Sequence, residues 1–171
     1  MIKALFLDRD GVINIEKDYL YKIEEFEFID GVFETCQYFQ SKGYIIVVIT
    51  NQSGIDRAYY SHEDFKVLSD WMVDAFKQEG IDIAKVYYCP HHPSISGACS
   101  CRKPHAGMIE KAQKDFDIDL AHSLLVGDKI SDIEAGQNAG VGENYLIATG
   151  HDISAEHYQP QIDNLKELIK G

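Results

Sequence analysis

The chain has 171 residues, of which 45% are hydrophobic and 26% are charged, a composition typical of a globular protein and not of a disordered or fibrous one. Its 28 acidic residues outnumber its 16 Lys and Arg residues, and the net charge of −12 argues against nucleic acid and anionic membrane surfaces as partners. We expect one domain over residues 1–171, and no feature of the sequence demands a partner chain, so we expect a monomer.

The predicted elements alternate between strands and helices along the chain. Short apolar, β-branched runs predict strands at residues 2–7, 44–50, 84–88, 123–126 and 144–148. Between them, apolar residues recur every three or four positions and predict helices. The expected helices are residues 32–39 before Gly43, residues 65–76 behind a Ser61 cap, a short one after a Ser131 cap, and one at residues 162–169.

This alternation predicts an α/β fold, a Rossmann-like, doubly wound parallel sheet with helices on both faces. Ligands bind such sheets beyond the carboxyl ends of the strands, so the residues that directly follow the apolar runs are the candidates for chemistry. The apolar start of the chain, residues 4–7, is too short for a signal peptide or a membrane span. We therefore expect a cytoplasmic protein.

Carboxylates gather at the predicted strand ends. Asp8 and Asp10 follow the first strand, and Asp128 follows the fourth. Buried carboxylates need a partner or a cation, and an all-oxygen site of this kind suits Mg²⁺. We expect Asp8 to attack phosphorus and form an aspartyl-phosphate, with Asp10 as general acid and then general base. Lys103 and Thr50 would offset the charge of the phosphoryl oxygens.

Each of these pieces alone has an ordinary interpretation. An Asp-x-Asp-Gly sequence or a Gly-Asp pair is often a turn, Thr-Asn is often a loop after a strand, and a single lysine is usually solvated. The joint order of all four along the chain is what favours the catalytic interpretation.

Three cysteines and a histidine cluster within a long irregular stretch. Cys89, His91, Cys99 and Cys101 supply a complete tetrahedral set for a structural Zn²⁺, which would fix the segment that carries Arg102 and Lys103. The alternative is a group of free core thiols or an oxidisable cysteine pair.

Seven segments together resemble one family. They are DRDGVIN (8–14), FEFIDGV (26–32), VITNQSGI (48–55), YYCPHHP (87–93), CSCRKP (99–104), GMI (107–109) and VGDKISD (126–132). They resemble the haloacid dehalogenase superfamily and, within it, the D-glycero-D-manno-heptose 1,7-bisphosphate 7-phosphatases of nucleotide-activated heptose biosynthesis. The resemblance implies a fold without a large cap domain and a small phosphorylated sugar as the substrate.

The resemblance also implies roles for individual residues. It makes Asp8 the nucleophile and Asp10 the acid/base, both in contact with Mg²⁺, with Asp128 completing the metal set and Lys129 beside it. Thr50 and Lys103 would steady the phosphoryl group. The residues expected to contact the rest of the substrate are Glu16, Lys17, Asp18, Tyr19, Asn51, Gln52, Ser53 and Arg102.

Two alternatives stay open. Histidinol-phosphate phosphatases resemble the chain in their acids, their lysine and their zinc loop, and the short segment between His91 and Cys99 fits them too, whereas residues 26–32 and 51–55 look more like the heptose enzymes. A zinc-stabilised binding module that has lost catalysis is the second alternative. Such a module would be expected to have lost one of its central residues, and all four of them are present: Asp8, Asp10, Lys103 and Asp128.

Overall fold

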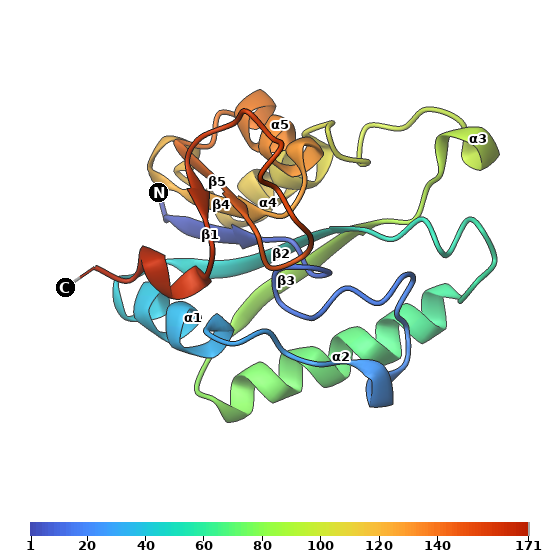
Figure 1. The fold of residues 1–171 in the computed structure, drawn as a ribbon, viewed down its shortest axis with the longest axis horizontal. Coiled ribbons are helices and arrows are strands. Elements are labelled where there is room, and N and C mark those ends of the chain that lie inside the picture. Colours follow the sequence, from blue (N-terminus) through green and yellow to red (C-terminus); the bar gives the residue numbers. More distant parts are fainter. Residues whose placement is uncertain (171) are drawn as a thin grey trace.

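A six-stranded, fully parallel sheet forms the centre of the protein, whose computed structural model describes residues 1–170 (Figure 1). The strands are β1 (Ala4–Leu7), β2 (Ile45–Asn51), β3 (Ile83–Cys89), β4 (Leu124–Gly127), β5 (Glu143–Ile147) and β6 (Gln161–Ile162). They lie in the order β3-β2-β1-β4-β5-β6, and every neighbouring pair is parallel. The predicted α/β class is confirmed, as are five of these strands.

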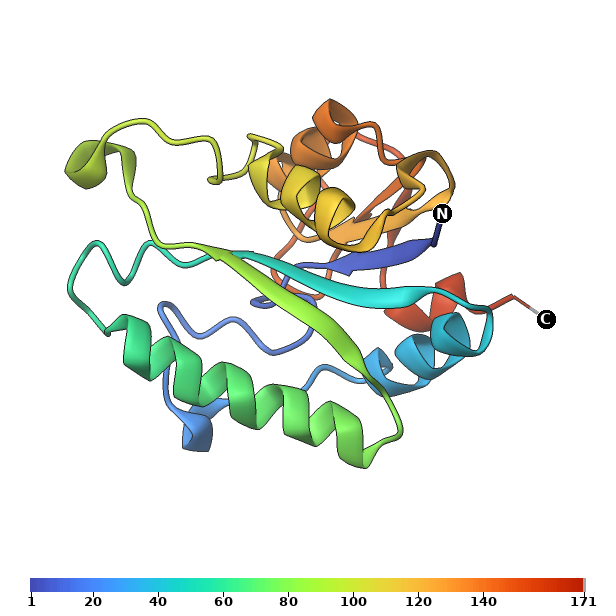
Figure 2. The ribbon, with the colours of Figure 1, turned by 180° about the vertical axis from the view of Figure 1, so that it is seen from behind.

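Helices cover both faces of the sheet. The α-helices are α1 (Val32–Ser41), α2 (His62–Gln78), α3 (Pro93–Ser96), α4 (Gly107–Phe116) and α5 (Ile130–Ala139), and three single turns of 3₁₀ helix occupy Ile23–Glu25, Leu120–His122 and Leu165–Leu168. Opposite views place α1 and α2 on one side of the sheet and α4 and α5 on the other (Figures 1 and 2). Among the described residues, no helix combines the length and the apolar character needed to cross a membrane.

The two-residue period of the strands explains these two layers. Leu5 and Leu7 of β1 belong to the apolar core on the α1–α2 side, whereas Ala4 and Phe6 belong to the core on the α4–α5 side. Successive side chains of a strand point to opposite faces, so an unbroken apolar run is what a strand covered on both sides requires.

The helix ends agree with the sequence in two cases and differ in a third. Ser61 and Asp64 form the reciprocal capping contacts that begin α2. Helix α1 ends just before Gly43, which adopts a left-handed φ of +89°. The expected Ser131 cap is wrong, because α5 begins at Ile130 behind Lys129, whose backbone N–H donates to Asp132 Oδ2 at 3.1 Å.

The expected helix at residues 162–169 is also wrong. Ile162 pairs with Ile147 in the short edge strand β6, and only the 3₁₀ turn at Leu165–Leu168 is helical. Asn164 caps that turn, and Glu167 Oε2 accepts hydrogen bonds from the backbone N–H groups of Asp163 and Asn164. The apolar residues of this stretch are spaced as in a helix because a strand and a turn both place them in the same core.

The strand order fixes where a ligand can bind. The chain runs outward from β1 through β2 to β3, then crosses back to β4 on the other side of β1. A parallel sheet opens a crevice where the order reverses, beyond the carboxyl ends of the two strands involved. That point lies between β1 and β4, whose carboxyl ends face the right-hand side of Figure 1.

Candidate active site

Three buried carboxylates converge at this switch point. Asp8 follows β1, Asp128 follows β4, and Asp132 lies in the first turn of α5; one oxygen from each lies within 4.8 Å of the others. Gly11, with φ at +88°, makes room for the cluster, because a Cβ there would stand 2.3 Å from Asp128 Oδ2. The sequence predicted two members of this cluster and gave no role to Asp132.

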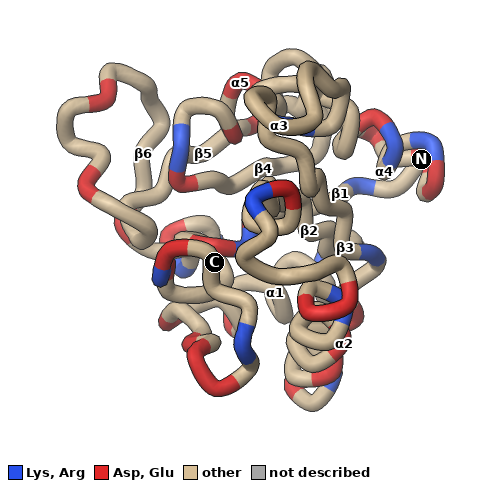
Figure 3. Tube along the Cα trace, turned by 90° about the vertical axis from the view of Figure 1, so that its right-hand side faces the viewer, with Lys and Arg blue, Asp and Glu red and all other residues tan. Residues whose placement is uncertain are grey.

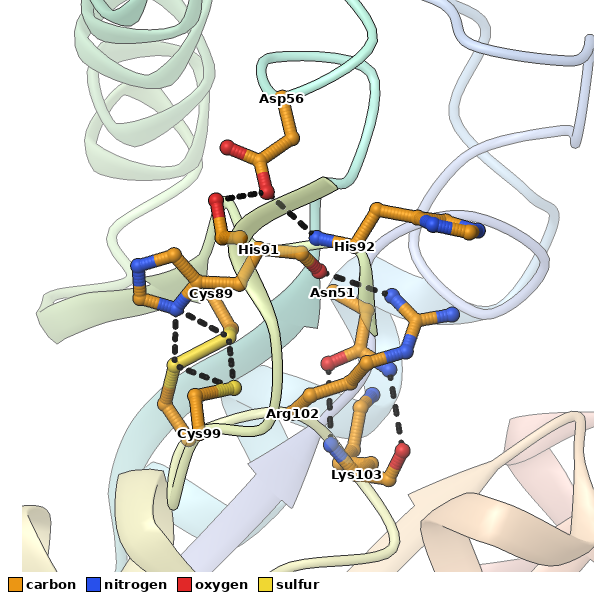
Figure 4. The surroundings of a disulfide bond; sticks show 10 residues. Asn51, Asp56, Cys89, His91, His92, Cys99, Arg102 and Lys103 are labelled. Carbon is orange, nitrogen blue, oxygen red and sulfur yellow. Dashed lines mark hydrogen bonds between the residues drawn. A yellow bond between two sulfur atoms is a disulfide. The ribbon is translucent and has the colours of Figure 1, made fainter. Parts of the chain in front are cut away.

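Lys103 is the one buried cation in contact with the cluster among the described residues. Its Nζ lies 3.1 Å from Asp8 Oδ1 and 2.5 Å from Asp132 Oδ1, and it donates to the backbone oxygen of Ile49 at 3.2 Å. Its backbone N–H and carbonyl pair reciprocally with the amide of Asn51 at the end of β2 (Figure 4). The segment that follows the cysteines therefore delivers its lysine to the acids, as the sequence predicted.

The electrostatics of the cluster call for another cation. Burial is the main cause that raises the pKa of both Asp8 and Asp128, and the nearby Asp132 carboxylate is the second. Burial alone would lower the pKa of Lys103, but the carboxylates of Asp132 and Asp8 outweigh it and raise that pKa. Three ionised carboxylates and one buried ammonium leave two negative charges uncompensated, and Asp128 Oδ1 is buried without a hydrogen-bond partner. These features fit a bound divalent cation.

Asp10 stands apart from the cluster and is held in one orientation. Its oxygens accept hydrogen bonds from Arg9 Nη2 at 3.0 Å, Asn14 Nδ2 at 3.0 Å and Gln52 Nε2 at 3.1 Å. Its carboxylate lies outside the group of acids whose oxygens are close enough to share a metal. Gln52 Nε2 also donates to the hydroxyl of buried Thr50 at 2.8 Å. Through Asp10 and Thr50, Gln52 thus links the ends of β1 and β2.

Two neighbouring cavities lie beside the acids. The inner one has a volume of about 70 Å³, and the outer one about 520 Å³. Both are lined by Asp10, Glu16, Asn51, Lys103, Lys129 and Ser131. Seen from the carboxyl ends of the strands, Lys and Arg positions lie beside Asp and Glu positions (Figure 3). The inner cavity reaches Asp8 and Asp132, whereas the outer one extends to Tyr19, Arg57 and Arg102.

Most of the residues expected to contact the substrate line the outer cavity. They are Glu16, Asp18, Tyr19, Asn51, Gln52, Ser53 and Arg102. Lys17 is the exception: its Nζ turns to the carbonyl of Glu25 at 2.8 Å and to Glu27 Oε1 at 2.7 Å. Arg57 and Tyr60 also line the cavity and were not predicted. Their only signal in the sequence was a position soon after the second strand end.

The cysteines and the histidine of the irregular segment do come together. Cys89 ends β3, and the ligand atoms of Cys89, His91, Cys99 and Cys101 lie within 4.8 Å of one another. In this structure Cys89 and Cys101 are joined as a disulfide, beside the ring of His91 and the thiol of Cys99 (Figure 4). The expected cluster is present, while the zinc predicted to fill it is not confirmed.

Comparison with known proteins identifies the family. A protein of Campylobacter jejuni named D-glycero-alpha-D-manno-heptose-1,7-bisphosphate 7-phosphatase is 50% identical over 167 residues, covering 98% of this chain and 94% of the relative. The chain belongs to the heptose bisphosphate 7-phosphatase family. A Burkholderia mallei relative with the same name is 53% identical over 150 residues, covering 85% of the chain and 79% of the relative.

Further comparisons agree with this family. The HAD-hydrolase-like family model matches residues 100–168. The crystal structure of the D,D-heptose 1,7-bisphosphate phosphatase of B. bronchiseptica, complexed with magnesium and phosphate, superposes with a TM-score of 0.86 at 30% identity, covering 96% of this chain and 94% of that one. The heptose bisphosphate 7-phosphatase fold is therefore shared along almost the whole chain.

Proposed function

We propose that the protein is a phosphatase that removes the 7-phosphate of D-glycero-D-manno-heptose 1,7-bisphosphate. The observation that carries the proposal is the contact of Asp8 with Lys103 inside a buried acid cluster, at the switch point of a sheet whose sequence relatives bear that name. The names of the relatives do not favour the histidinol-phosphate alternative. Three relatives named for the α anomer are 48–53% identical to the chain, whereas five named for the β anomer are 41–46% identical, so we expect the α anomer to be preferred.

The proposed chemistry uses two carboxylates. An oxygen of Asp8 attacks phosphorus, and the bond from phosphorus to the sugar oxygen breaks as the aspartyl-phosphate forms. Asp10 gives a proton to the leaving sugar oxygen, then takes one from the water that attacks the aspartyl-phosphate and releases inorganic phosphate. The three donors that orient Asp10 hold it for both proton transfers, and Lys103 offsets the negative charge on the phosphoryl oxygens.

The acid cluster would hold Mg²⁺. Asp8 and Asp128 are the carboxylates available for it, because both oxygens of Asp132 are engaged, one by Lys103 and the other by the backbone of Lys129. Water would complete the metal set. Asp10 was also predicted as a ligand, and its carboxylate, held by three donors outside the cluster, would have to turn toward the cation to join the set. When bound, the cation reduces the repulsion between Asp8 and the phosphate dianion.

The cysteine and histidine cluster would hold Zn²⁺ when its thiols are reduced. Tetrahedral zinc with Zn–S bonds of about 2.3 Å and Zn–N bonds of about 2.0 Å separates its ligand atoms by about 3.5–3.8 Å. Here His91 Nδ1 lies 3.5 Å from Cys89 Sγ and 3.3 Å from Cys101 Sγ. Cys99 Sγ lies 3.6 and 3.7 Å from the same two sulfurs. Four of the six ligand separations thus lie within about 0.2 Å of those of a closed tetrahedral site.

The zinc assignment has a direct test. Protein purified under reducing conditions should contain one zinc per chain by elemental analysis, and Cys101→Ser should lose zinc and melt at a lower temperature. Cys36 is buried away from the cluster, so Cys36→Ser serves as the matched cysteine control and should keep its zinc. An intact mass that shows an oxidised cysteine pair, together with no bound zinc, would support the disulfide instead.

The activity is tested by phosphate release from both anomers of heptose 1,7-bisphosphate and from histidinol phosphate. We expect the heptose bisphosphates to be the better substrates, with ³¹P spectra showing loss of the 7-phosphate. Asp8→Asn, which keeps the shape of the side chain, should reduce turnover to background. Equal turnover by wild type and Asp8→Asn would refute the nucleophile, and faster turnover of histidinol phosphate would refute the substrate.

A further inference from the structure

Two arginines of the outer cavity lack an acidic partner. The sequence contains three arginines, and Arg9 forms a buried ion pair with Asp10. Among residues 1–170, no carboxylate lies within 4.0 Å of the guanidinium of Arg57 or Arg102, although the protein has 28 acidic residues. Both line the outer cavity. Their charge is thus available to an anion there.

Arg57 keeps most of its donors free. A guanidinium has five N–H donors, and the partner of Arg57 within the described residues is His92 Nε2, at 2.7 Å from Nη2. Its Nε is buried and has no hydrogen-bond partner. The guanidinium carbon also lies 5.7 Å from the centre of the Tyr19 ring, which lines the same cavity.

His92 and its neighbours hold Arg57 in place. Arginine has no acceptor, so His92 Nε2 must accept the hydrogen bond from Arg57, and a neutral ring then carries its proton on Nδ1. That proton is donated to the Ser94 hydroxyl oxygen at 2.6 Å, and the backbone N–H of Ser94, 3.2 Å from Nδ1, does not donate to the ring in this tautomer. Next to Arg57, Asp56 Oδ2 accepts from the backbone N–H of His92 at 2.7 Å and from the Ser96 hydroxyl at 2.5 Å (Figure 4). The loop of Arg57 is thereby fastened to the segment that carries the cysteine cluster.

Figure 4 shows how this segment serves two purposes. The ring of His91 turns toward the sulfur atoms, whereas the ring of its neighbour His92 points away from them. Arg102 Nη1 donates to the backbone carbonyl of His91 at 3.2 Å, so the second free guanidinium is anchored on the same segment. One face of the segment is thus built around the cysteines, and the other supports two cations.

We propose that Arg57 is a specificity-determining residue that binds the phosphate that is not transferred, together with Arg102, and that His92 is its positioning residue. This inference rests on the proposed function. The inner cavity, at Asp8, has room for one phosphoryl group, so the second phosphate of a bisphosphate must lie in the outer cavity. In a chain of net charge −12, a second dianion requires local cations, and the two unpaired guanidiniums supply them there.

The test compares a bisphosphate with a monophosphate that lacks the second group. For Arg57→Gln we expect kcat/KM for heptose 1,7-bisphosphate to fall about ten- to hundredfold, mainly through KM, because charge-assisted hydrogen bonds to the substrate are lost. For heptose 7-phosphate we expect kcat/KM within about twofold of wild type. Lys77→Gln, which removes an exposed charge from α2, is the matched control and should leave both values unchanged.

Three outcomes would overturn the inference, and they are distinguishable. An equal loss for both substrates would make the role of Arg57 structural, and no loss for either would remove it from binding. A wild-type protein that hydrolyses neither sugar phosphate would remove the proposed function itself, and the inference with it.

The role of His92 is tested in the same assay. His92→Ala should raise KM for the bisphosphate and leave kcat/KM for the monophosphate unchanged. His92→Gln should restore part of the loss, since the Gln carbonyl can accept from Arg57. Zinc content and melting temperature measured on both variants show whether the segment is intact. A wild-type KM for the bisphosphate in a folded His92→Ala protein would reject the positioning role.

Discussion

Asp132 links the lysine of the site to the helix that follows β4. Its Oδ1 lies 2.5 Å from Lys103 Nζ, and its Oδ2 accepts from the backbone N–H of Lys129. Gly127 permits this approach, because a Cβ there would stand 2.2 Å from the Asp132 Cβ. Asp132 thus fixes a cation that Asp8 needs, although it is too fully engaged to react itself.

We predict that Asp132→Asn lowers kcat about ten- to hundredfold, because Lys103 loses its ion pair with Asp132 and keeps only Asp8 and the Ile49 carbonyl as partners, which fix its position less firmly. The side chain keeps its shape, so the circular dichroism spectrum should match that of wild type. Steady-state kinetics with saturating Mg²⁺ measure the effect. Asp82→Asn, an exposed substitution just before β3, is the control, and an Asp132→Asn enzyme as fast as this control would contradict the prediction.

At the scale of the elements, capping hydrogen bonds set where helix α2 begins beside the site. Helix α2 starts directly after the loop that carries Arg57, and its first turn is held by Ser61 Oγ, which accepts from the backbone of Asp64 at 3.0 Å, and by Asp64 Oδ2, which accepts from the backbone of Ser61 at 2.9 Å. The capping contacts therefore also fix one end of that loop.

We predict that Ser61→Ala lowers the free energy of unfolding by about 1 kcal/mol, since the backbone N–H of Asp64 loses its acceptor. Urea denaturation followed by circular dichroism measures the change. Ser61→Asp, which can cap the same N–H, should stay within about 0.5 kcal/mol of wild type. Equal destabilisation by both substitutions would show that the hydroxyl is not the source of the effect.

Local sequence patterns predicted most of the strands and helices and the acids at the strand ends. They did not predict residues whose contacts depend on distant parts of the chain. Buried runs such as β1 and the first five residues of β2 are visible in sequence because strands covered on both faces require unbroken apolar residues. The two residues of β6 are too few to show a period. Asp132 and Arg57 were missed for a related reason: their partners, Lys103 and His92, are 29 and 35 residues away in sequence, and only the folded chain joins them.

At the scale of the whole molecule, the fold buries more carboxylates than cations at the site. The strand order places Asp8 and Asp128 at one point, and α5 adds Asp132. The apolar cores on both faces of the sheet keep these groups dry, which raises the pKa of Asp8 and Asp128. In metal-free protein, the stability that these two carboxyls contribute is present at acidic pH and is lost as pH rises through their raised folded-state pKa values.

A divalent cation should remove this penalty, so Mg²⁺ should stabilise the fold, and more strongly at pH 7.5 than at pH 5, where protons compete for the same oxygens. At 100 times its dissociation constant the ligand adds about 2.7 kcal/mol to the free energy of unfolding, which is a rise in melting temperature of about 5–10 °C for a chain of this size. Calorimetry of EDTA-treated protein with and without Mg²⁺ measures the shift. Asp128→Asn should abolish it, while Asp82→Asn should keep it. A shift that survives in Asp128→Asn, or that is larger at pH 5, would place the cation elsewhere.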